Sequence, residues 1–447
     1  MNISEIIRLR QQRNAQASTS ATPEQPQDFT AEEVDPGDSH ESDTAPDEPQ
    51  QDPAPDLSEQ LEDIAKEADA SREGAADRMG RLLQEIAQEL PCYQDQYGNF
   101  YVLYTNGRKP EHVPLASERF ADIVRVTAIE RGGPNTFVPK ERIETLRSIC
   151  RYQAMQRPPV PVQGRVGKDG DDNLYDLGDG DLVRTNAAGS IIERNTRFAF
   201  RWAREKAVVA PPVPCEDPRE AFKRLKPLLA GVPKVDMLPL VAAVVEYFRP
   251  DTPYPIIQLN GPEGSSKSSV AEHIIRVVDN FVSAEPPSTG LEAEDMVASA
   301  QVHHCLFIDN ATHLPKGVEN LLCVMALGGV ITERQLYTNS EVHSAPVHNP
   351  IIITAIQPIL RQSDALDRSY TINVQKPTVY RSMAEVRAEY AAKLPEIHGA
   401  LLCLLSTALR LRPQVAQVPG ISQHRMIDWI MTGEAIAQSL GQPPGRF

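Results

Sequence analysis

PIIQLNGPEGSSKSSVAE, residues Pro255–Glu272, is the stretch that decides the fold. Its first part, Ile256–Leu259, is mostly apolar and predicts a short buried strand. After that strand come three residues typical of a tight turn: Gly261, Pro262 and Gly264. Lys267 and Ser268 follow, and the next residues carry apolar side chains at helical spacing. A strand, a glycine-containing loop, a Lys-Ser pair and a helix occur in this order in phosphate-binding loops.

Such a loop binds phosphate because its N–H groups and the helix N-terminus present partial positive charge. Lys267 would reach the β- and γ-phosphates of a nucleotide, and the Ser268 hydroxyl would bind Mg²⁺. Ser266 stands where glycine is usual, and it fits if its backbone is not strongly left-handed. The alternative is a surface loop that carries Gly and Lys by chance. The predicted nucleotide-binding residues are Gly261, Pro262, Glu263, Gly264, Ser265, Ser266, Lys267, Ser268 and Ser269.

A second motif, HCLFIDN at His304–Asn310, is an apolar strand that ends in a carboxylate. In phosphate-loop ATPases an Asp at this place binds Mg²⁺ through water, so Asp309 and Ser268 are the predicted metal residues. Hydrolysis also needs a group that orients or deprotonates the attacking water. Asn310 can orient water but cannot take its proton. Either Glu263 or Glu333 supplies the acid, or turnover is slow, or positioning and charge do most of the work.

Downstream, GGVITERQLYTNSEVHSAP (residues 328–346) predicts a hairpin. Arg334 and Tyr337 would project from it and could touch the phosphates and bases of a DNA strand that passes through a pore. The alternative is an ordinary surface hairpin, which the residues alone favour.

The strand Ile351–Ile353 ends at Thr354, a polar group placed to sense the γ-phosphate side. Arg368 follows an acidic turn and could serve as an arginine finger for a neighbouring subunit. The alternative for Arg368 is a structural ion pair with Asp364 or Asp367. For Arg361 a solvated surface position is favoured. Lys267, Asp309, Asn310, Thr354 and Arg368 are thus the predicted catalytic residues.

Composition bounds the remaining classes. The 447 residues contain 41% apolar side chains and carry a formal net charge of −16. This acidic balance argues against a protein that coats nucleic acid with a generally basic surface. The six cysteines form no C-x-x-C pair, which argues against zinc and disulfide frameworks. No apolar run reaches membrane-spanning length and the N-terminus lacks an apolar signal core. We expect a cytoplasmic protein without a membrane partner.

The chain divides into five predicted segments. Residues 1–57 form an acidic, Pro-rich segment that we expect to be disordered. Residues 58–91 are helical, with an apolar stripe from Met79 to Leu90. Residues 92–207 form a small α+β, β-rich domain. Residues 215–376 form an α/β phosphate-loop core, and residues 377–447 form a helical C-terminal region with helices over 377–396, 398–411 and 427–440.

Aromatic and cationic residues alternate near the end of the β-rich domain, at Arg197–Arg204. That interleaving could suit a nucleic-acid strand. A strand that buries its apolar face and turns its arginines outward explains the pattern equally well.

Taken together, the motifs resemble the phage- and mobile-element-associated ATP-binding proteins related to superfamily 3 primase-helicases. The resemblance rests on PYPIIQLNGPEGSSKS, LFIDNATHLP, GGVITERQLYTNSE, PIIITAI and SDALDRS in this order, with YDLGDGDLVR before them and HRMIDWIMTGEAIAQSLG after them. It covers roughly residues 92–440. No part of it resembles a primase active site, so primer synthesis is not expected.

The resemblance implies an AAA+-type ATPase core that uses ATP and Mg²⁺, assembles as a ring of probable hexameric size, and works on single-stranded DNA in replication. It also implies that Arg368 is the finger and that Arg334 and Tyr337 lie in the pore hairpin. Three departures, Ser266 for Gly, Asn310 for an acid and Thr354 for Asn, bear on hydrolysis more than on binding.

A second hypothesis is a nucleotide-gated regulatory or defence ATPase that binds a protein partner with little turnover. Asn310 and the acidic total favour it. A third is a replication loader that docks through Met1–Asn14, so a replication or host protein is a further candidate partner.

Overall fold

The computed structural model describes residues 78–106, 109–195, 197–200, 208–280, 292–334, 342–423 and 425–447. These fall into two units, one made of residues 78–89 and 121–146 and the other of residues 90–120 and 147–447. The predicted disordered segment 1–57, the first part of the helical segment 58–91, and Tyr337 lie outside the described residues.

The first unit is helical. Residues 78–89 form a helix that buries Leu83 and Ile86, as the predicted apolar stripe requires. It also contains most of α3 (Glu118–Gly132) and the start of α4 (Lys140–Met155). Within this unit the Arg131 guanidinium donates to both carboxylate oxygens of Glu89, at 3.1 and 2.5 Å.

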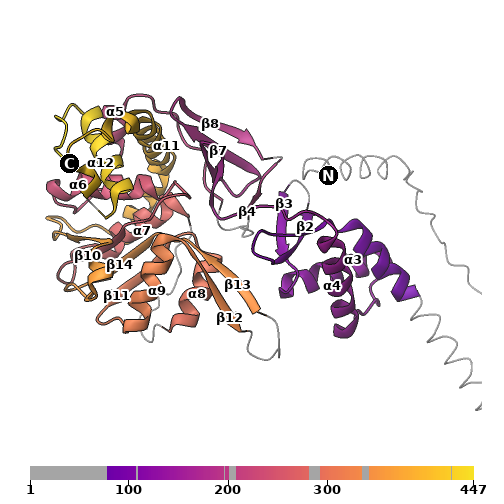
Figure 1. The fold of residues 1–447 in the computed structure, drawn as a ribbon. Coiled ribbons are helices and arrows are strands. Elements are labelled where there is room, and N and C mark those ends of the chain that lie inside the picture. The colour runs from indigo at the N-terminus through magenta and orange to yellow at the C-terminus, as the bar shows by residue number, and fades with distance from the viewer. Residues whose placement is uncertain are drawn as a thin grey trace, which may run out of the picture. The chain divides into compact units, whose positions relative to one another are not determined.

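Two small antiparallel sheets precede the phosphate loop (Figure 1). The first contains β1 (Cys92–Gln94), β2 (Phe100–Asn106) and β3 (Lys109–Pro114), in that order. The second contains β5 (Val166–Asp169), β6 (Asp172–Asp176), β7 (Asp181–Asn186) and β8 (Gly189–Arg194). Two short strands, β4 (Val162–Gln163) and β9 (Ala199–Phe200), pair in parallel.

The β5–β8 sheet shares its hydrophobic core with the phosphate-loop half of the chain. Val166, Tyr175 and Val183 belong to the same buried cluster as residues of the central sheet and its helices. The fully buried guanidinium of Arg165 also donates to the Asp279 carboxylate and its backbone carbonyl, at 3.2 and 2.8 Å. The boundary that we expected near residue 207 therefore does not separate two hydrophobic cores.

The central sheet is parallel, with strand order β11-β14-β10-β15. Its strands are β10 (Ile256–Asn260), β11 (Leu306–Ala311), β14 (Ile351–Ala355) and β15 (Ser369–Asn373). The connecting helices are α7 (Lys267–Val278), α8 (Ala293–Val302), α9 (Lys316–Leu327) and the short α10 (Ser363–Leu366). The predicted α/β architecture is present, and β14 lies between the loop strand β10 and the Asp309 strand β11.

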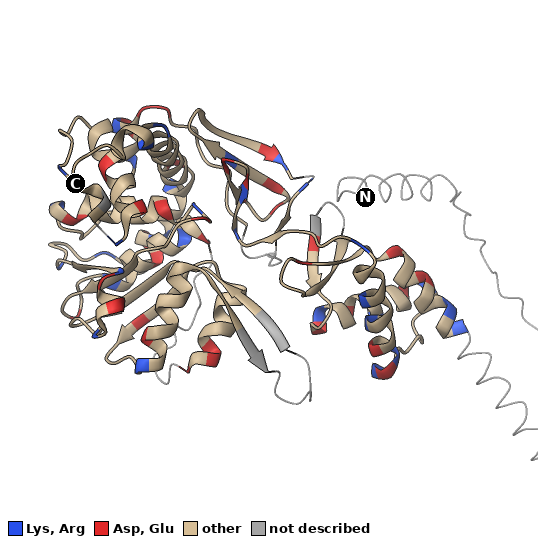
Figure 2. Ribbon diagram, viewed as in Figure 1, with Lys and Arg blue, Asp and Glu red and all other residues tan. Residues whose placement is uncertain are grey.

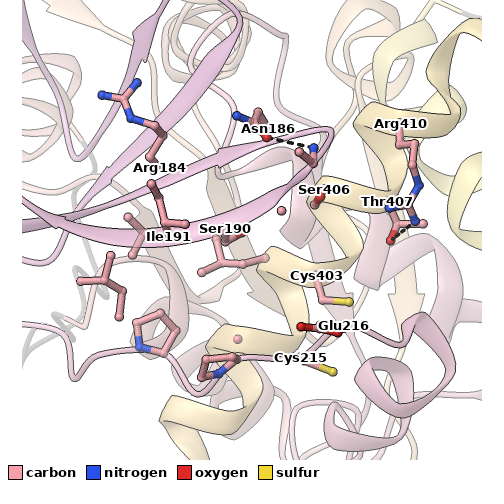
Figure 3. A pocket seen from close by; sticks show the side chains of 18 residues that line it. Arg184, Asn186, Ser190, Ile191, Cys215, Glu216, Cys403, Ser406, Thr407 and Arg410 are labelled. Carbon is pink, nitrogen blue, oxygen red and sulfur yellow. Dashed lines mark hydrogen bonds between the residues drawn. The ribbon is translucent and has the colours of Figure 1, made fainter.

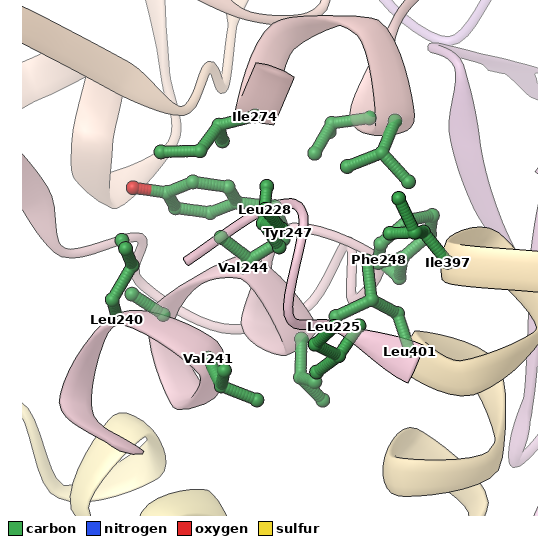
Figure 4. Packing of buried hydrophobic residues seen from close by; sticks show 14 of the residues in the cluster. Leu225, Leu228, Leu240, Val241, Val244, Tyr247, Phe248, Ile274, Ile397 and Leu401 are labelled. Atoms are coloured by element: carbon green, nitrogen blue, oxygen red, sulfur yellow. The ribbon is translucent and has the colours of Figure 1, made fainter. Parts of the chain in front are cut away.

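The largest core cluster lies where helices from both ends of this region meet (Figure 4). They are α5 (Pro218–Arg224), α6 (Lys234–Glu246), α11 (Met383–Val415) and α12 (Ile427–Ser439), with the 3₁₀ turn Ile421–Gln423 before α12. Tyr247 and Phe248 stand among Leu225, Leu228, Val244, Ile274, Ile397 and Leu401. This packing fixes the helix that follows the phosphate loop.

Helix α11 differs from the prediction, which divided it into two helices. It runs without interruption from Met383 to Val415 and contains Pro395 and Pro413. Among the described helices it is the one long and apolar enough to cross a membrane, but 72% of its most apolar window is buried in the fold. Its apolar surface is thus used in the protein core.

The predicted hairpin downstream of Asp309 is present. Strands β12 (Gly329–Arg334) and β13 (Val342–Val347) pair antiparallel, from Gly329 opposite Val347 to Arg334 opposite Val342. Arg334 thus ends the first strand. The tip of the hairpin and the side chains near it lie outside what the structure describes.

Candidate nucleotide-binding site

The loop between β10 and α7 requires glycine at two positions. A Cβ on Gly261 would lie 2.8 Å from the Val374 carbonyl oxygen and 2.7 Å from the Ser265 hydroxyl. Gly264 has φ +74°, in the left-handed region that glycine adopts without strain. These two residues let the loop turn tightly at the carboxyl end of the central strand.

Ser266 is strained, contrary to the condition under which we expected it to fit. Its φ of 64° and ψ of 23° place it in the left-handed helical region immediately before α7. A non-glycine residue is held there at a cost of about 1–2 kcal/mol. The glycine that is usual at this position would remove that strain.

Buried polar side chains without hydrogen-bond partners lie in the loop and at the end of the strand before it. The hydroxyl of Ser265 and both side-chain polar atoms of Asn260 are buried and have no hydrogen-bond partner among the described residues. The Lys267 ammonium donates to the carbonyl oxygens of Gly261 and Pro262, at 2.7 and 3.0 Å. A lysine ammonium beside a glycine turn and a helix N-terminus fits a phosphate group.

Asp309 lies beside the loop helix, as the metal hypothesis requires. The Ser268 hydroxyl donates to Asp309 Oδ1 at 2.8 Å, and the Thr354 hydroxyl donates to the same oxygen at 2.5 Å. Among the described residues no cluster of three or more His, Cys, Asp or Glu side chains could hold a metal. A Mg²⁺ at Ser268 and Asp309 would therefore take its other ligands from phosphate and water, as this ion usually does.

Of the two acids named as candidate general bases, only the side chain of Glu263 belongs to the described part of the chain. Asn310 follows Asp309 with φ +50° and has an exposed side chain. Glu263 is exposed on the loop, and the side chain of Glu333 lies outside the description. The three alternatives for water activation that follow from the sequence therefore stay predictions.

Arg368 is buried and paired within its own chain in the structure. Its residue is only 8% exposed, and its guanidinium donates to the Asp364 carboxylate at 2.8 Å. Arg425 donates to Asp364 and Asp367 as well, at 2.5 and 3.0 Å. The ion pair with Asp364 that we considered as the alternative is thus present, and a role of Arg368 as an arginine finger stays a prediction. Arg361 is exposed, as we expected.

A cavity of about 570 Å³ opens directly beside the loop. The segment after β15 supplies one wall, with Val379 71% and Tyr380 66% exposed, and Met383 stands beside them. The Tyr380 hydroxyl donates to the Gly264 carbonyl at 3.4 Å. These residues were not predicted from the sequence, where the local signal is a group of apolar side chains between a strand and a helix.

An ion pair joins α11 to the loop helix α7. Arg387, in the first turns of α11, donates from Nε and Nη2 to Glu272 of α7, at 2.9 and 3.0 Å. Burial alone would raise the pKa of Glu272, but the hydrogen bonds from Arg387 and Arg276 hold that pKa below its ordinary value. On the cavity wall, burial lowers the pKa of His273 to about 4, so its ring is neutral at pH 7.

The arginines of the β5–β8 sheet are neutralised. Arg184 pairs with Asp169, Asp172 and Glu193, and Figure 2 shows acidic and basic residues together on these strands. Phe200 is buried, which agrees with the strand interpretation, while the predicted partners Arg201, Trp202 and Arg204 lie outside the described residues. The described part of this sheet offers no unpaired basic face for a nucleic acid.

A larger cavity, of about 760 Å³, lies away from the loop (Figure 3). Its walls are the β7–β8 hairpin, the Pro212–Glu216 segment and the middle of α11, and its lining includes neither Lys267 nor Asp309. The cavity beside the loop is smaller, but Lys267 and Ser268 line it, so it is the candidate for nucleotide binding.

Residues 232–440 match the family described as "Actinomycete integrative conjugative element replication protein". The resemblance to mobile-element replication proteins is thereby confirmed for this part of the chain, which contains the loop, Asp309 and Thr354. No curated protein matches the chain.

Several solved structures overlap the chain at low similarity. "SCCmec type IV Cch - active helicase" is 12% identical, covers 79% of this chain and 70% of its own, and has a TM-score of 0.41. The apo NrS-1 C-terminal region is 10% identical, with 81% and 90% covered and a TM-score of 0.38. The JCV helicase is 14% identical, with 51% and 74% covered and a TM-score of 0.24. Similarity at this level supports no assignment of function to a residue.

Proposed function

We propose that the chain is an ATP-dependent motor, built on an AAA+-type core, that acts on single-stranded DNA during replication of a mobile element. The observation that carries the proposal is the meeting of Ser268 and Asp309 at 2.8 Å beside the Lys267 loop. Ligands bind at the carboxyl ends of the strands in open parallel sheets. The family matched by residues 232–440 supplies the replication context.

In this proposal each residue has a definite task. Lys267 and the loop N–H groups bind the β- and γ-phosphates of ATP. Ser268 and Asp309 hold Mg²⁺, which would neutralise charge on the phosphate oxygens. Asn310 orients the attacking water without taking its proton. The nucleoside lies in the 570 Å³ cavity, where Val379, Tyr380 and Met383 offer apolar surface to a base.

We further propose that copies of the chain form a ring, with the β12–β13 hairpin facing a central pore. Arg334 at the end of β12 and Tyr337 beyond it would contact the phosphates and bases of the strand.

A second candidate, a nucleotide-gated switch that binds a replication or host protein, is favoured by one observation. Asn310 follows Asp309, and Glu263, the acid nearest in sequence to the loop lysine, is exposed. A site of this kind could bind ATP tightly and turn it over slowly.

The deciding measurement is the ATPase rate of the purified chain with and without single-stranded DNA at low salt, where phosphate contacts are strongest. We expect stimulation by DNA. Lys267→Ala should lower turnover about a hundredfold or more, because a preorganised cationic donor to the phosphates is lost. Lys393→Ala is the matched control, because Lys393 is exposed on α11 and contacts Glu396. Turnover without DNA stimulation would count against a motor, and tight binding with negligible turnover would favour the switch.

A further inference from the structure

The pairing of β11 with β14 is irregular at the functional residues. Ile308 lies opposite Ile353 and Ala311 lies opposite Ala355. Two residues, Asp309 and Asn310, therefore share a single opposite residue, Thr354. A bulge of this kind leaves a backbone group without its ladder partner and redirects the side chains beside it.

The Thr354 side chain fills the place of the missing ladder partner. Its hydroxyl accepts a hydrogen bond from the Asn310 backbone N–H at 2.7 Å and donates to Asp309 Oδ1 at 2.5 Å. Thr354 is 0% exposed, and a β-branched side chain in a strand has few rotamers. The hydroxyl is thus fixed in direction, and with it the backbone of the bulge.

The hydrogen-bonding capacity of a threonine hydroxyl decides what Thr354 can do. A hydroxyl has one proton to donate and two lone pairs that accept. Thr354 gives its single proton to Asp309. A phosphate oxygen can only accept, so in this arrangement Thr354 has nothing to donate to it. These bonds direct the hydroxyl to Asp309, and a part of Thr354 in sensing the γ-phosphate side stays a prediction.

We propose that Thr354 is a positioning residue, which holds the Asp309 carboxylate and the Asp309–Asn310 bulge in the arrangement that binds Mg²⁺ with the nucleotide. The inference rests on the proposed nucleotide site. The loop helix supports the same arrangement, because the Ser268 hydroxyl also donates to Asp309 Oδ1. Hydrogen bonds that orient a metal-binding carboxylate typically change metal affinity by roughly tenfold to a hundredfold.

The test measures the affinity of a fluorescent ATP analogue with Mg²⁺ and with EDTA, and takes the ratio as the gain from Mg²⁺. Thr354→Val keeps the shape and removes the hydroxyl. We expect its affinity in EDTA to equal that of the wild type and its gain from Mg²⁺ to fall roughly tenfold or more. Thr354→Ser restores the hydroxyl and should restore the gain.

Thr432→Val is the matched control. Thr432 is also buried, and its hydroxyl also donates to a buried carboxylate, that of Glu246 on α6. Its loss should lower the melting temperature and leave the gain from Mg²⁺ unchanged. If Thr354→Val does not fold, Thr354→Cys replaces it, since a thiol is a weak donor, and the same fall in gain is expected.

The outcomes separate the two proposals. A wild type that binds no nucleotide, or gains nothing from Mg²⁺, overturns the proposed function and this inference with it. A wild type with a clear gain that Thr354→Val retains in full overturns the positioning role alone. So does a variant that loses affinity equally with Mg²⁺ and with EDTA, because that result describes general damage to the site.

Discussion

Ser266, in the loop before α7, has a backbone conformation that serine adopts only with strain. Ser266 adopts φ 64°, where glycine is unstrained, yet the rest of the loop has the form that a phosphate site needs. The strain is small beside the packing of α7, whose residues Val270, Ile274 and Val277 are all buried. A protein tolerates a strained residue when the surrounding structure fixes the backbone on both sides.

We expect Ser266→Gly to raise the free energy of unfolding by up to about 1.5 kcal/mol. The substitution removes about 1–2 kcal/mol of left-handed strain, and about 0.5–1 kcal/mol of this is offset by the greater freedom of glycine in the unfolded chain. Denaturant unfolding measures the difference. Ser269→Gly, in the first turn of α7, is the control and should lower stability by about 0.5–1 kcal/mol. Equal destabilisation by both changes would contradict the left-handed assignment.

At the scale of the element, α11 is one helix where the spacing of apolar residues predicted two. Pro395 normally interrupts a helix because it lacks an N–H and its ring crowds the preceding turn. Here the helix continues, and the Val213 N–H donates to the Pro395 carbonyl at 2.9 Å. The segment that carries Val213 runs so close to α11 that only glycine fits at position 399, where a Cβ would lie 1.7 Å from the Val213 carbonyl oxygen.

Gly399→Ala should therefore lower the free energy of unfolding by about 3 kcal/mol or more, because a backbone carbonyl must move to admit the methyl group. Thermal or urea unfolding followed by circular dichroism tests this. Gly317→Ala is the matched control, since Gly317 lies in α9 with nothing within 4 Å of the added Cβ. That change should stabilise the protein by about 0.5–1 kcal/mol. A tolerated Gly399→Ala would show that the close approach is not present in solution.

At the scale of the whole molecule, one core supports both the β5–β8 sheet and the nucleotide site, and several ionisable groups are buried in it. Burial lowers the pKa of His304 and His348 to about 4, and that of His398 to about 3. Neither ring nitrogen of His398 has a hydrogen-bond partner among the described residues. These rings are neutral in the folded chain at pH values where an exposed histidine, with a pKa of about 6.5, is charged.

Stability should consequently depend on pH in a defined window. Between pH about 6.5 and about 4 the unfolded chain binds protons that the folded chain does not, so the free energy of unfolding falls as the pH falls. Above that window these histidines contribute a constant stability. Urea unfolding at a series of pH values measures the slope. His398→Leu removes one such group and should flatten the profile, and an unchanged slope in this variant would contradict the burial of a neutral ring.

The sequence by itself determined the glycine loop before Lys267, the strand that contains Asp309, the hairpin after it and the α/β character of the core. These depend on glycine at turns, apolar spacing and the order of motifs, which are local properties of the chain. The resemblance to mobile-element replication proteins was determined in the same way.

Only the tertiary structure decided which side chains meet. Because β14 lies between β10 and β11, Thr354 reaches Asp309 and its hydroxyl is used there. Because Asp364 is one helical turn from a buried arginine, Arg368 pairs within its own chain. The cavity beside the loop and the core shared with β5–β8 likewise join segments far apart in the sequence. Spacing along the chain does not encode such contacts, since they follow from the order of strands in the sheet and from the packing of its faces.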